Sequence, residues 1–280
     1  MRKIIFKILR YSGLPFIFRE IVQRNKVTIL MFHEIDKVTA EKTFAYLTRN
    51  YSIIDLNDFI DACKKKDNTK FPKKAMILTF DDGHLSNYEI LPVITKYKLP
   101  VTIFLCSAII NTNRHYWFRL NMESQEVSKL KLVSNKKRLE LLANMGFDQD
   151  KEFEMPQAMQ KLHIDQMKDS VNLQSHTMYH PILPKCDYDE AKKEIFDSKA
   201  FLENEYGLKI SSIAYPNGDY SERDIELVKA AGYECAITVD PGYNTLTSDL
   251  FRLKRLSSND TSDLNELIVK SSGVWTFFKN

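Results

Sequence analysis

Short apolar runs alternate along the chain with longer segments in which apolar residues recur every three or four positions. The run from Ala75 to Phe80, for example, is rich in β-forming residues and has no alternating polar ones. Such runs are typical of strands that are covered on both faces. We therefore predict strands over residues 27–32, 75–80, 101–106, 171–174, 212–215, 235–239 and 252–256.

The segments between these runs have the spacing of helices. The clearest helix covers Asp187 to Tyr206: Asp187 can cap its start, and Gly207 can end it. Its apolar residues recur at helical intervals, which indicates one buried face. We predict further helices over residues 39–50, 56–66, 86–98, 221–231 and 263–270.

The alternation of strand and helix predicts the fold class. It favours parallel strands with helices outside them. About seven such units in one chain indicate an α/β fold, a distorted (β/α) barrel, rather than two domains. An open doubly wound sheet is the alternative, although the sequence lacks the G-x-G-x-x-G loop that often marks such sheets.

One long segment interrupts the alternation of predicted strands and helices. Residues 111–170 separate two predicted strands by more than a simple connection needs. They include helix-like pieces at 123–131 and 135–145. We interpret the segment as an insertion beside the functional site, within a single barrel domain that covers residues 27–280.

The N-terminal region, residues 1–26, is basic and apolar. We predict two short amphipathic helices here, broken near Gly13 and Pro15. We favour packing of these helices against the barrel floor, and a peripheral membrane contact through residues 1–24 is the alternative. The basic residues that would make this contact are Arg2, Lys3, Lys7 and Arg10.

The sequence has no clear export signal. No small-residue cleavage site follows the N-terminal region, and no apolar run approaches the ~20 residues of a membrane span. We therefore expect a protein that is cytoplasmic or peripheral to the cytoplasmic face of the membrane.

Composition narrows the classes of function. Apolar residues make up 44% of the chain, enough for a substantial core, and the net charge of +3 is too weak to indicate a nucleic-acid partner. The four cysteines are widely spaced without a C-x-x-C pair, which argues against a thiolate zinc site. The sequence leaves the oligomeric state open.

Two adjacent carboxylates follow the strand that ends at Phe80. Asp81 and Asp82 lie in the segment T-F-D-D-G, where Gly83 lets the backbone turn sharply. Neighbouring carboxylates repel one another unless a positive group neutralises them, and a divalent metal held by one of them would do so. Alone, such a segment is more often a solvated turn.

Two histidines follow the strand predicted at 171–174. His176 and His180 lie in the segment S-H-T-M-Y-H-P, and their i, i+4 spacing puts both rings on one side of a helical turn. Two imidazoles and one carboxylate make a three-ligand set that leaves positions open for water and substrate. Alone, the pair is often just a polar helix start.

Both motifs lie at the ends of predicted strands, and together they therefore indicate a functional site more strongly than either does alone. The carboxyl ends of barrel strands form one common rim, so residues distant in sequence can meet there. Other polar or turn residues at predicted strand ends are His33, Pro216, Asn217 and Arg255.

The two motifs closely resemble those of the polysaccharide deacetylase family, also called carbohydrate esterase family 4. The segment I-A-Y-P-N-G at 213–218 is similar to the third motif of that family. The segment L-M-F-H at 30–33 resembles the opening strand of the branch that deacetylates bacterial exopolysaccharides. The resemblance spans about residues 27–260.

The resemblance implies a site with one divalent metal ion, usually zinc. Asp82, His176 and His180 would bind the metal, and Asp81 would be the general base. By motif position, the backbone N–H of Asn217 would donate to the oxyanion, with Pro216 beside the substrate.

The sequence departs from the family pattern at two positions. Many members carry an arginine in the third motif that aligns the catalytic aspartate, and this chain has Ala214 there; we interpret Arg255 as its replacement. A Leu-x-His segment that supplies the general acid in many members is also absent. We assign that role to His33, as in the exopolysaccharide branch; the alternative is a buried histidine bonded to Glu34 or Asp36.

Tyr116 and Trp117 lie in the insertion shortly after a predicted strand. Either ring could stack on a sugar. Equally, both could anchor the insertion to the barrel, since clustered aromatics are often core.

Taken together, the sequence predicts a metal-dependent hydrolase that removes N-acetyl groups from a sugar or polysaccharide. O-acetyl esterase activity, or deacetylation of a lipid-linked or small sugar precursor, is the alternative on the same scaffold. A non-catalytic carbohydrate-binding barrel is an alternative of another class.

Overall fold

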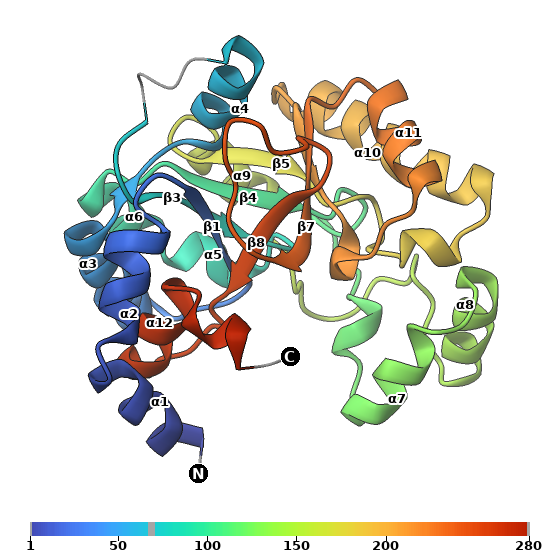
Figure 1. Ribbon diagram of the computed structural model, residues 1–280. Helices are drawn as coiled ribbons and strands as arrows, with labels where there is room; N and C mark the ends of the chain where they lie inside the picture. Colours follow the sequence, from blue (N-terminus) through green and yellow to red (C-terminus); the bar gives the residue numbers. More distant parts are fainter. Residues whose placement is uncertain (1, 67–70, 279–280) are drawn as a thin grey trace.

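Eight parallel strands form the sheet of the protein. The computed structural model describes residues 2–66 and 71–278 (Figure 1). The strands are β1 (Val27–Phe32), β2 (Ser52–Ile53), β3 (Ala75–Phe80), β4 (Val101–Leu105), β5 (Asn172–Ser175), β6 (Ser212–Ala214), β7 (Cys235–Pro241) and β8 (Leu253–Ser257).

Seven of these strands close into a ring. Around the ring the order is β1-β3-β4-β5-β6-β7-β8, and β1 closes it by pairing with both β3 and β8, while β2 pairs only with the start of β3. The ring is irregular: β5 and β6 share one paired position, Ser175 with Ile213, and the β7–β8 register shifts. The predicted distorted (β/α) barrel is therefore confirmed.

Helices surround the barrel. The α-helices are α1 (Arg2–Tyr11), α2 (Leu14–Ile17), α3 (Lys37–Asn50), α4 (Leu56–Lys65), α5 (Leu85–Glu89), α6 (Leu91–Tyr97), α7 (Ser124–Leu130), α8 (Asn135–Asn144), α9 (Lys161–Met167), α10 (Tyr188–Tyr206), α11 (Glu222–Ala230) and α12 (Leu264–Ser271). A π-helical turn covers Phe18–Val22, and short 3-10 turns cover Trp117–Arg119, Leu183–Lys185, Pro216–Gly218 and Val274–Phe277.

Alternate strand residues fill the inside of the barrel. A buried cluster contains every second residue at the start of several strands, for example Ala75 and Ile77 of β3. Leu56, Phe59 and Ile60 of α4 belong to the same cluster, so α4 covers the end of the barrel at which the strands begin (Figure 1). The interior is a packed core, and the opposite rim is left for chemistry.

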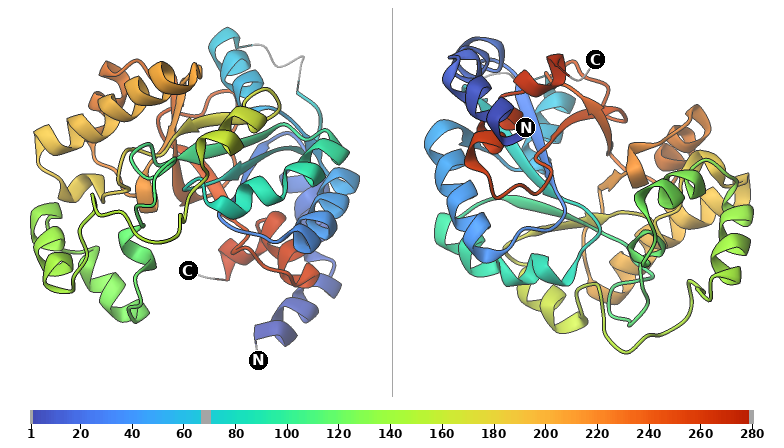
Figure 2. Two further views of the ribbon diagram at one scale, coloured as in Figure 1. Left: turned by 180° about the vertical axis from the view of Figure 1, so that it is seen from behind. Right: turned by 90° about the horizontal axis from the view of Figure 1, so that it is seen from below.

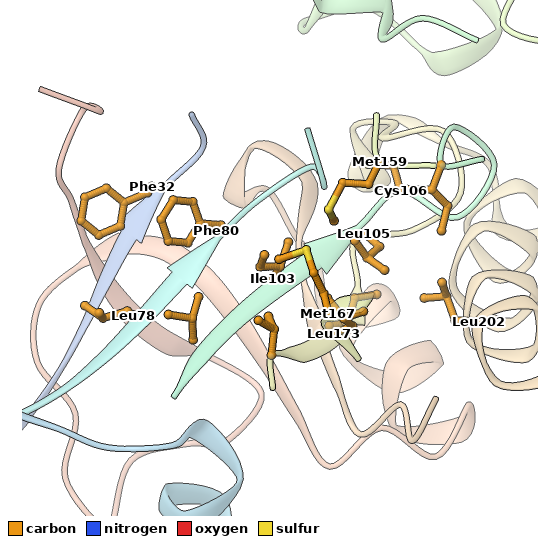
Figure 3. Packing of buried hydrophobic residues seen from close by; sticks show 14 of the residues in the cluster. Phe32, Leu78, Phe80, Ile103, Leu105, Cys106, Met159, Met167, Leu173 and Leu202 are labelled. Carbon is orange, nitrogen blue, oxygen red and sulfur yellow. The ribbon is translucent and has the colours of Figure 1, made fainter. Parts of the chain in front are cut away.

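The remaining strand residues point outward against the helices. Figure 3 shows Leu78 and Phe80 of β3 beside Ile103 and Leu105 of β4 in this outer layer. The rings of Phe32 and Phe80 stack with centroids 5.0 Å apart. Both strand faces are therefore apolar, which explains why the sequence shows runs instead of alternation.

Two connections differ from the sequence prediction. The helix predicted over 86–98 is two helices, α5 and α6, which meet at Ile90. Pro92 lies in the first turn of α6, where its missing N–H is tolerated; inside one continuous helix it would break the ladder. The strand β2 and the helix α9 were not predicted, because two and seven residues leave little periodic signal.

The N-terminal helices and the insertion lie on different sides of the barrel. α1 packs against α12, burying Phe6 against Val269 and Val274, rather than against the floor that α4 covers. The insertion helices α7 and α8 lie on the opposite side of the molecule (Figures 1 and 2). Within the described residues, no helix is both long and apolar enough to cross a membrane.

Candidate metal and catalytic site

The predicted site residues meet at the rim of the barrel. Asp81 and Asp82 directly follow β3, and His176 directly follows β5. Asp82 and His180 both have left-handed backbones, with φ of 75° and 56°. Left-handed non-glycine residues are uncommon and often mark functional sites. Residues 176–180 form an irregular turn after β5 and not the expected helical turn, so the positive φ angles of Thr177 and His180, and not an i, i+4 helix spacing, bring the two rings together.

Asp82, His176 and His180 form a buried cluster that fits a metal ion. Their ligand atoms lie within 4.8 Å of one another. The Nε2 atoms of both histidines are 3.4 Å from the same carboxylate oxygen, Oδ1 of Asp82. Two ligands of a tetrahedral zinc ion, each about 2.05 Å from the metal, would be roughly 3.3 Å apart. The observed spacing is therefore that of a ligand set.

The hydrogen bonds around this cluster support the same interpretation. Nδ1 of His176 lies 2.8 Å from the carbonyl of Ala214, so the ring donates there and its Nε2 keeps a free lone pair. Oδ1 of Asp82 is buried without a hydrogen-bond partner among the described residues. A buried carboxylate oxygen rarely lacks a partner, and a cation would satisfy it.

Burial and nearby charges set the protonation states of the candidate histidine and carboxylate ligands. Burial lowers the pKa of His180 to about 3, so the ring is neutral at physiological pH. For Asp82, burial raises the pKa, but contacts with His176 and His84 lower it by more, well below its usual value. A neutral imidazole and an ionised carboxylate are the protonation states that bind a metal.

Asp81 is held by an arginine from the last strand. Arg255 donates from Nη1 and Nη2 to the two oxygens of Asp81, at 2.7 and 2.8 Å, and from Nε to the carbonyl of Thr238 at 2.7 Å. Burial raises the pKa of Asp81, but the charge of Arg255 leads the contacts that lower it below its usual value. Asp81 is therefore an ionised, oriented carboxylate beside the cluster of Asp82, His176 and His180.

His84 supports the cluster, although the sequence motifs gave it no role. Its Nε2 lies 3.0 Å from Oδ2 of Asp82, and Nη1 of Arg119 donates to its Nδ1 at 3.1 Å. The ring therefore donates to Asp82 and leaves Oδ1 facing the two histidines. Arg119 in turn pairs with Glu34 at 2.9 Å. Only its position two residues after Asp82 could have suggested this role.

Tyr116 and Trp117 are buried against the backbone of two of the candidate ligand residues, Asp82 and His180. The hydroxyl of Tyr116 donates to the carbonyl of Asp82 at 2.8 Å, and Nε1 of Trp117 donates to the carbonyl of His180 at 2.9 Å. Their residues are 0% and 4% exposed, which leaves no face for a sugar. The expectation that they stack on substrate is therefore corrected, and both residues anchor the insertion.

His33 lies at the end of β1 and pairs with Asp260, not with Glu34 or Asp36. Its Nδ1 is 3.2 Å from Oδ2 of Asp260, and its backbone N–H donates to Oδ1 at 2.8 Å. Burial lowers the pKa of His33, but this bond and the charges of Asp81 and Asp82 raise it to about 9. A partly exposed, protonated imidazole therefore stands at the rim.

The third motif forms a tight turn at the same rim. Asn217 has a left-handed backbone, with φ of 58°, between the buried residues Pro216 and Gly218. Its side-chain oxygen accepts a hydrogen bond from Lys131 of the insertion at 2.6 Å. The insertion therefore contacts the third motif as well as Asp82.

Comparison with known proteins identifies the family. A model of the polysaccharide deacetylase family matches residues 68–236, more than half of the chain. The chain belongs to the polysaccharide deacetylase family. The predicted family is therefore confirmed, and the two motifs at Asp81 and His176 lie inside the matched region.

Individual relatives are distant. The poly-beta-1,6-N-acetyl-D-glucosamine N-deacetylase of Staphylococcus epidermidis is 25% identical over 266 residues, which cover 85% of this chain and 81% of the relative. The Bacillus subtilis protein YxkH is 23% identical over 185 residues; the match covers 66% of this chain and about half, 51%, of YxkH. The structure of IcaB from Ammonifex degensii has a TM-score of 0.65 at 17% identity, covering 90% of this chain and 98% of IcaB, which shows a shared fold.

Proposed function

We propose that this protein is a metal-dependent N-deacetylase of a polysaccharide that contains N-acetylglucosamine. The proposal rests on one observation: two different groups of side chains lie together at one rim of the barrel. One is the Asp82, His176 and His180 ligand set, and the other is the Asp81 carboxylate fixed by Arg255. The name of the Staphylococcus epidermidis relative supports a β-1,6-linked polymer as substrate.

Three residues would hold the metal ion. Asp82, His176 and His180 supply one oxygen and two nitrogens, a set that suits zinc and leaves room for water and substrate. A bound divalent ion supplies Lewis acidity, which acidifies a water molecule and polarises the acetyl carbonyl. His84 orients Asp82 for this role through their 3.0 Å contact.

Asp81 would act as the general base. It accepts the proton of the attacking water, and Arg255 keeps both of its oxygens in a fixed orientation during the transfer. The backbone N–H of Asn217 would donate to the oxyanion that develops on the former carbonyl oxygen.

His33 would act as the general acid. Hydrolysis of an amide needs a proton on the departing nitrogen, because an unprotonated amine anion is a very poor leaving group. His33 is kept protonated by Asp260, which also fixes its Nδ1 so that Nε2 is the proton-donating atom. A charged acid at this place favours N-deacetylation over O-deacetylation.

Acetate release tests the proposal. Zinc-loaded protein should release acetate from β-1,6-linked N-acetylglucosamine oligomers, and Asp81→Asn should stop turnover while the variant still binds one zinc ion. Asp58→Asn is the matched control, because Asp58 is exposed on α4 at the opposite end of the barrel. Full activity in Asp81→Asn would disprove the assignment of the base. Sugar binding by the zinc-loaded wild type without acetate release would instead support a carbohydrate-binding protein.

A further inference from the structure

Exposed apolar side chains are concentrated in one short segment. Of the 17 large hydrophobic residues exposed in the described structure, seven lie within residues 4–21. The other ten are scattered from Val38 to Phe278, and a scattered exposed apolar residue needs no explanation. The seven residues are Ile4, Ile5, Ile8, Tyr11, Phe16, Ile17 and Ile21, and we call them the N-terminal apolar surface.

The exposure does not come from a loosely attached helix. α1 is docked by its other face, which buries Phe6 among Val269, Val274 and Trp275. Arg2 pairs with Glu266 at 2.7 Å, and Arg10 donates to Asn265 at 2.9 Å. Both polar partners belong to α12. Ile4 and Ile8, each 64% exposed, and Tyr11, 70% exposed, lie one helical turn apart on the face that points away from α12.

Charge shows what this surface can bind. Residues 2–21 include five basic residues and one acidic residue, Glu20, which pairs with Arg19 and Lys74. Because Arg2 and Arg10 are bound to α12, the exposed residues Lys3 and Lys7 are left to meet a partner. A face with apolar side chains flanked by lysines matches the boundary of an anionic bilayer, where acyl chains lie beneath negative headgroups.

A second copy of the chain is a poorer partner for this surface. A two-fold dimer would place the surface against itself, and would bring Lys3 and Lys7 of α1 toward their equivalents on a helix that has no acidic residue of its own. We therefore propose that the N-terminal apolar surface binds anionic membranes by shallow insertion, with Lys3 and Lys7 on the headgroups. This proposal is independent of the catalytic assignment.

The position of α1 connects this surface with the catalytic rim. Arg2 of α1 lines a cavity of about 680 Å³ that also reaches Trp275 and Arg255. Arg255 is the partner of Asp81. A bilayer bound at α1 would therefore adjoin the rim at which substrate is expected.

Vesicle flotation of the full chain tests the proposal. The protein should float with phosphatidylcholine vesicles that contain phosphatidylglycerol, and bind vesicles of phosphatidylcholine alone roughly tenfold more weakly or worse. Ile4→Ser with Ile8→Ser should weaken binding by about tenfold or more, because two exposed apolar side chains no longer insert. Lys3→Glu with Lys7→Glu should weaken binding only to the anionic vesicles.

A matched control distinguishes binding through this surface from nonspecific binding through any exposed apolar residue. Leu132 and Leu162 are 72% and 63% exposed outside the segment, so Leu132→Ser with Leu162→Ser should float like the wild type. Circular dichroism should show that every variant is folded. The proposal is overturned if the folded wild type does not bind anionic vesicles, if Ile4→Ser with Ile8→Ser binds like the control, or if sedimentation shows that the surface forms a dimer.

Discussion

Arg255, 174 residues later in the sequence, donates hydrogen bonds to both carboxylate oxygens of Asp81. The side chains are 1% and 5% exposed, so the pair is almost fully removed from water. A buried charge that loses its partner is very unfavourable, whereas the intact pair adds little net stability. The folded structure therefore depends on this pair being intact, whatever the role of Asp81 in catalysis.

Removal of the guanidinium should destabilise the fold. We expect Arg255→Met to lower the free energy of unfolding by about 3–5 kcal/mol, because Asp81 then remains buried without a counter-charge. Arg255→Met combined with Asp81→Asn should cost much less than the two single changes together. Denaturant unfolding measures both. Additive costs would show that the two groups do not interact strongly.

The contact between His84 and Asp82 should control metal affinity. We expect His84→Ala to weaken zinc binding by roughly 10–100-fold, since Asp82 loses the bond that aims its free oxygen at the two histidines. His176→Ala should abolish binding. His163→Ala is the control, because His163 lies in α9 outside the ligand cluster. Competition with a chelator gives the affinities, and a wild-type value for His84→Ala would contradict this role.

The ion pair of His33 with Asp260 should depend on pH. The pKa of His33 in the folded protein, about 9, is higher than the ordinary 6.5. The stability that it contributes is therefore complete below pH 6.5 and is lost as the pH rises through about 9. Asp260→Asn should lower this pKa and reduce that pH dependence of stability, while Asp81 and Asp82 still raise the pKa. NMR titration of the His33 ring in metal-free protein checks the shift, and an unchanged pKa would rule out Asp260 as its main cause.

The same change should alter catalysis in a recognisable way. If His33 donates a proton to the leaving nitrogen, the alkaline limb of the acetate-release profile should move to lower pH in Asp260→Asn. Hydrolysis of an activated ester, whose leaving group needs little protonation, should be affected much less. Equal losses on both substrates would indicate a merely structural role for the pair.

The aromatic residues beneath the cluster should matter for stability and not for sugar binding. Tyr116→Phe removes one buried hydrogen bond and should cost about 1 kcal/mol. Trp117→Ala should cost about 3–5 kcal/mol, since a large buried ring is lost. Neither change should raise KM for an N-acetylglucosamine oligomer in the folded fraction. A raised KM at unchanged stability would restore the sugar-stacking interpretation.

Much of the barrel was predictable because burial on both faces leaves a strong mark on a sequence. The run from Val27 to Phe32 is apolar except for Thr28 and is a buried strand in the structure. The position of the motif residues at strand ends then follows from barrel geometry alone. The break at Ile90 was missed, since the apolar pattern continues across it although Pro92 does not fit the interior of one helix.

The supporting contacts were harder to predict, because they join loops that have no periodic pattern. Asp260 lies in a loop after β8 and meets His33 across 227 residues. Arg119 lies in the insertion and reaches His84 across 35 residues. Neither position belongs to a motif, and tertiary structure alone brings them to the rim. Arg255 could be suggested only because the usual arginine position holds Ala214.

The place of β8 in the chain has a consequence for how the protein is made. A ribosome delivers β3, with Asp81 and Asp82, long before it delivers Arg255, and the ring closes only when β8 pairs with β1. Until then, Asp81 has no guanidinium to offset its burial. The part of the chain that is already synthesised is therefore not stabilised in the final structure around Asp81. Synthesis of β8, closure of the barrel and pairing of Asp81 with Arg255 would then coincide, and a chain interrupted before β8 would lack this pair.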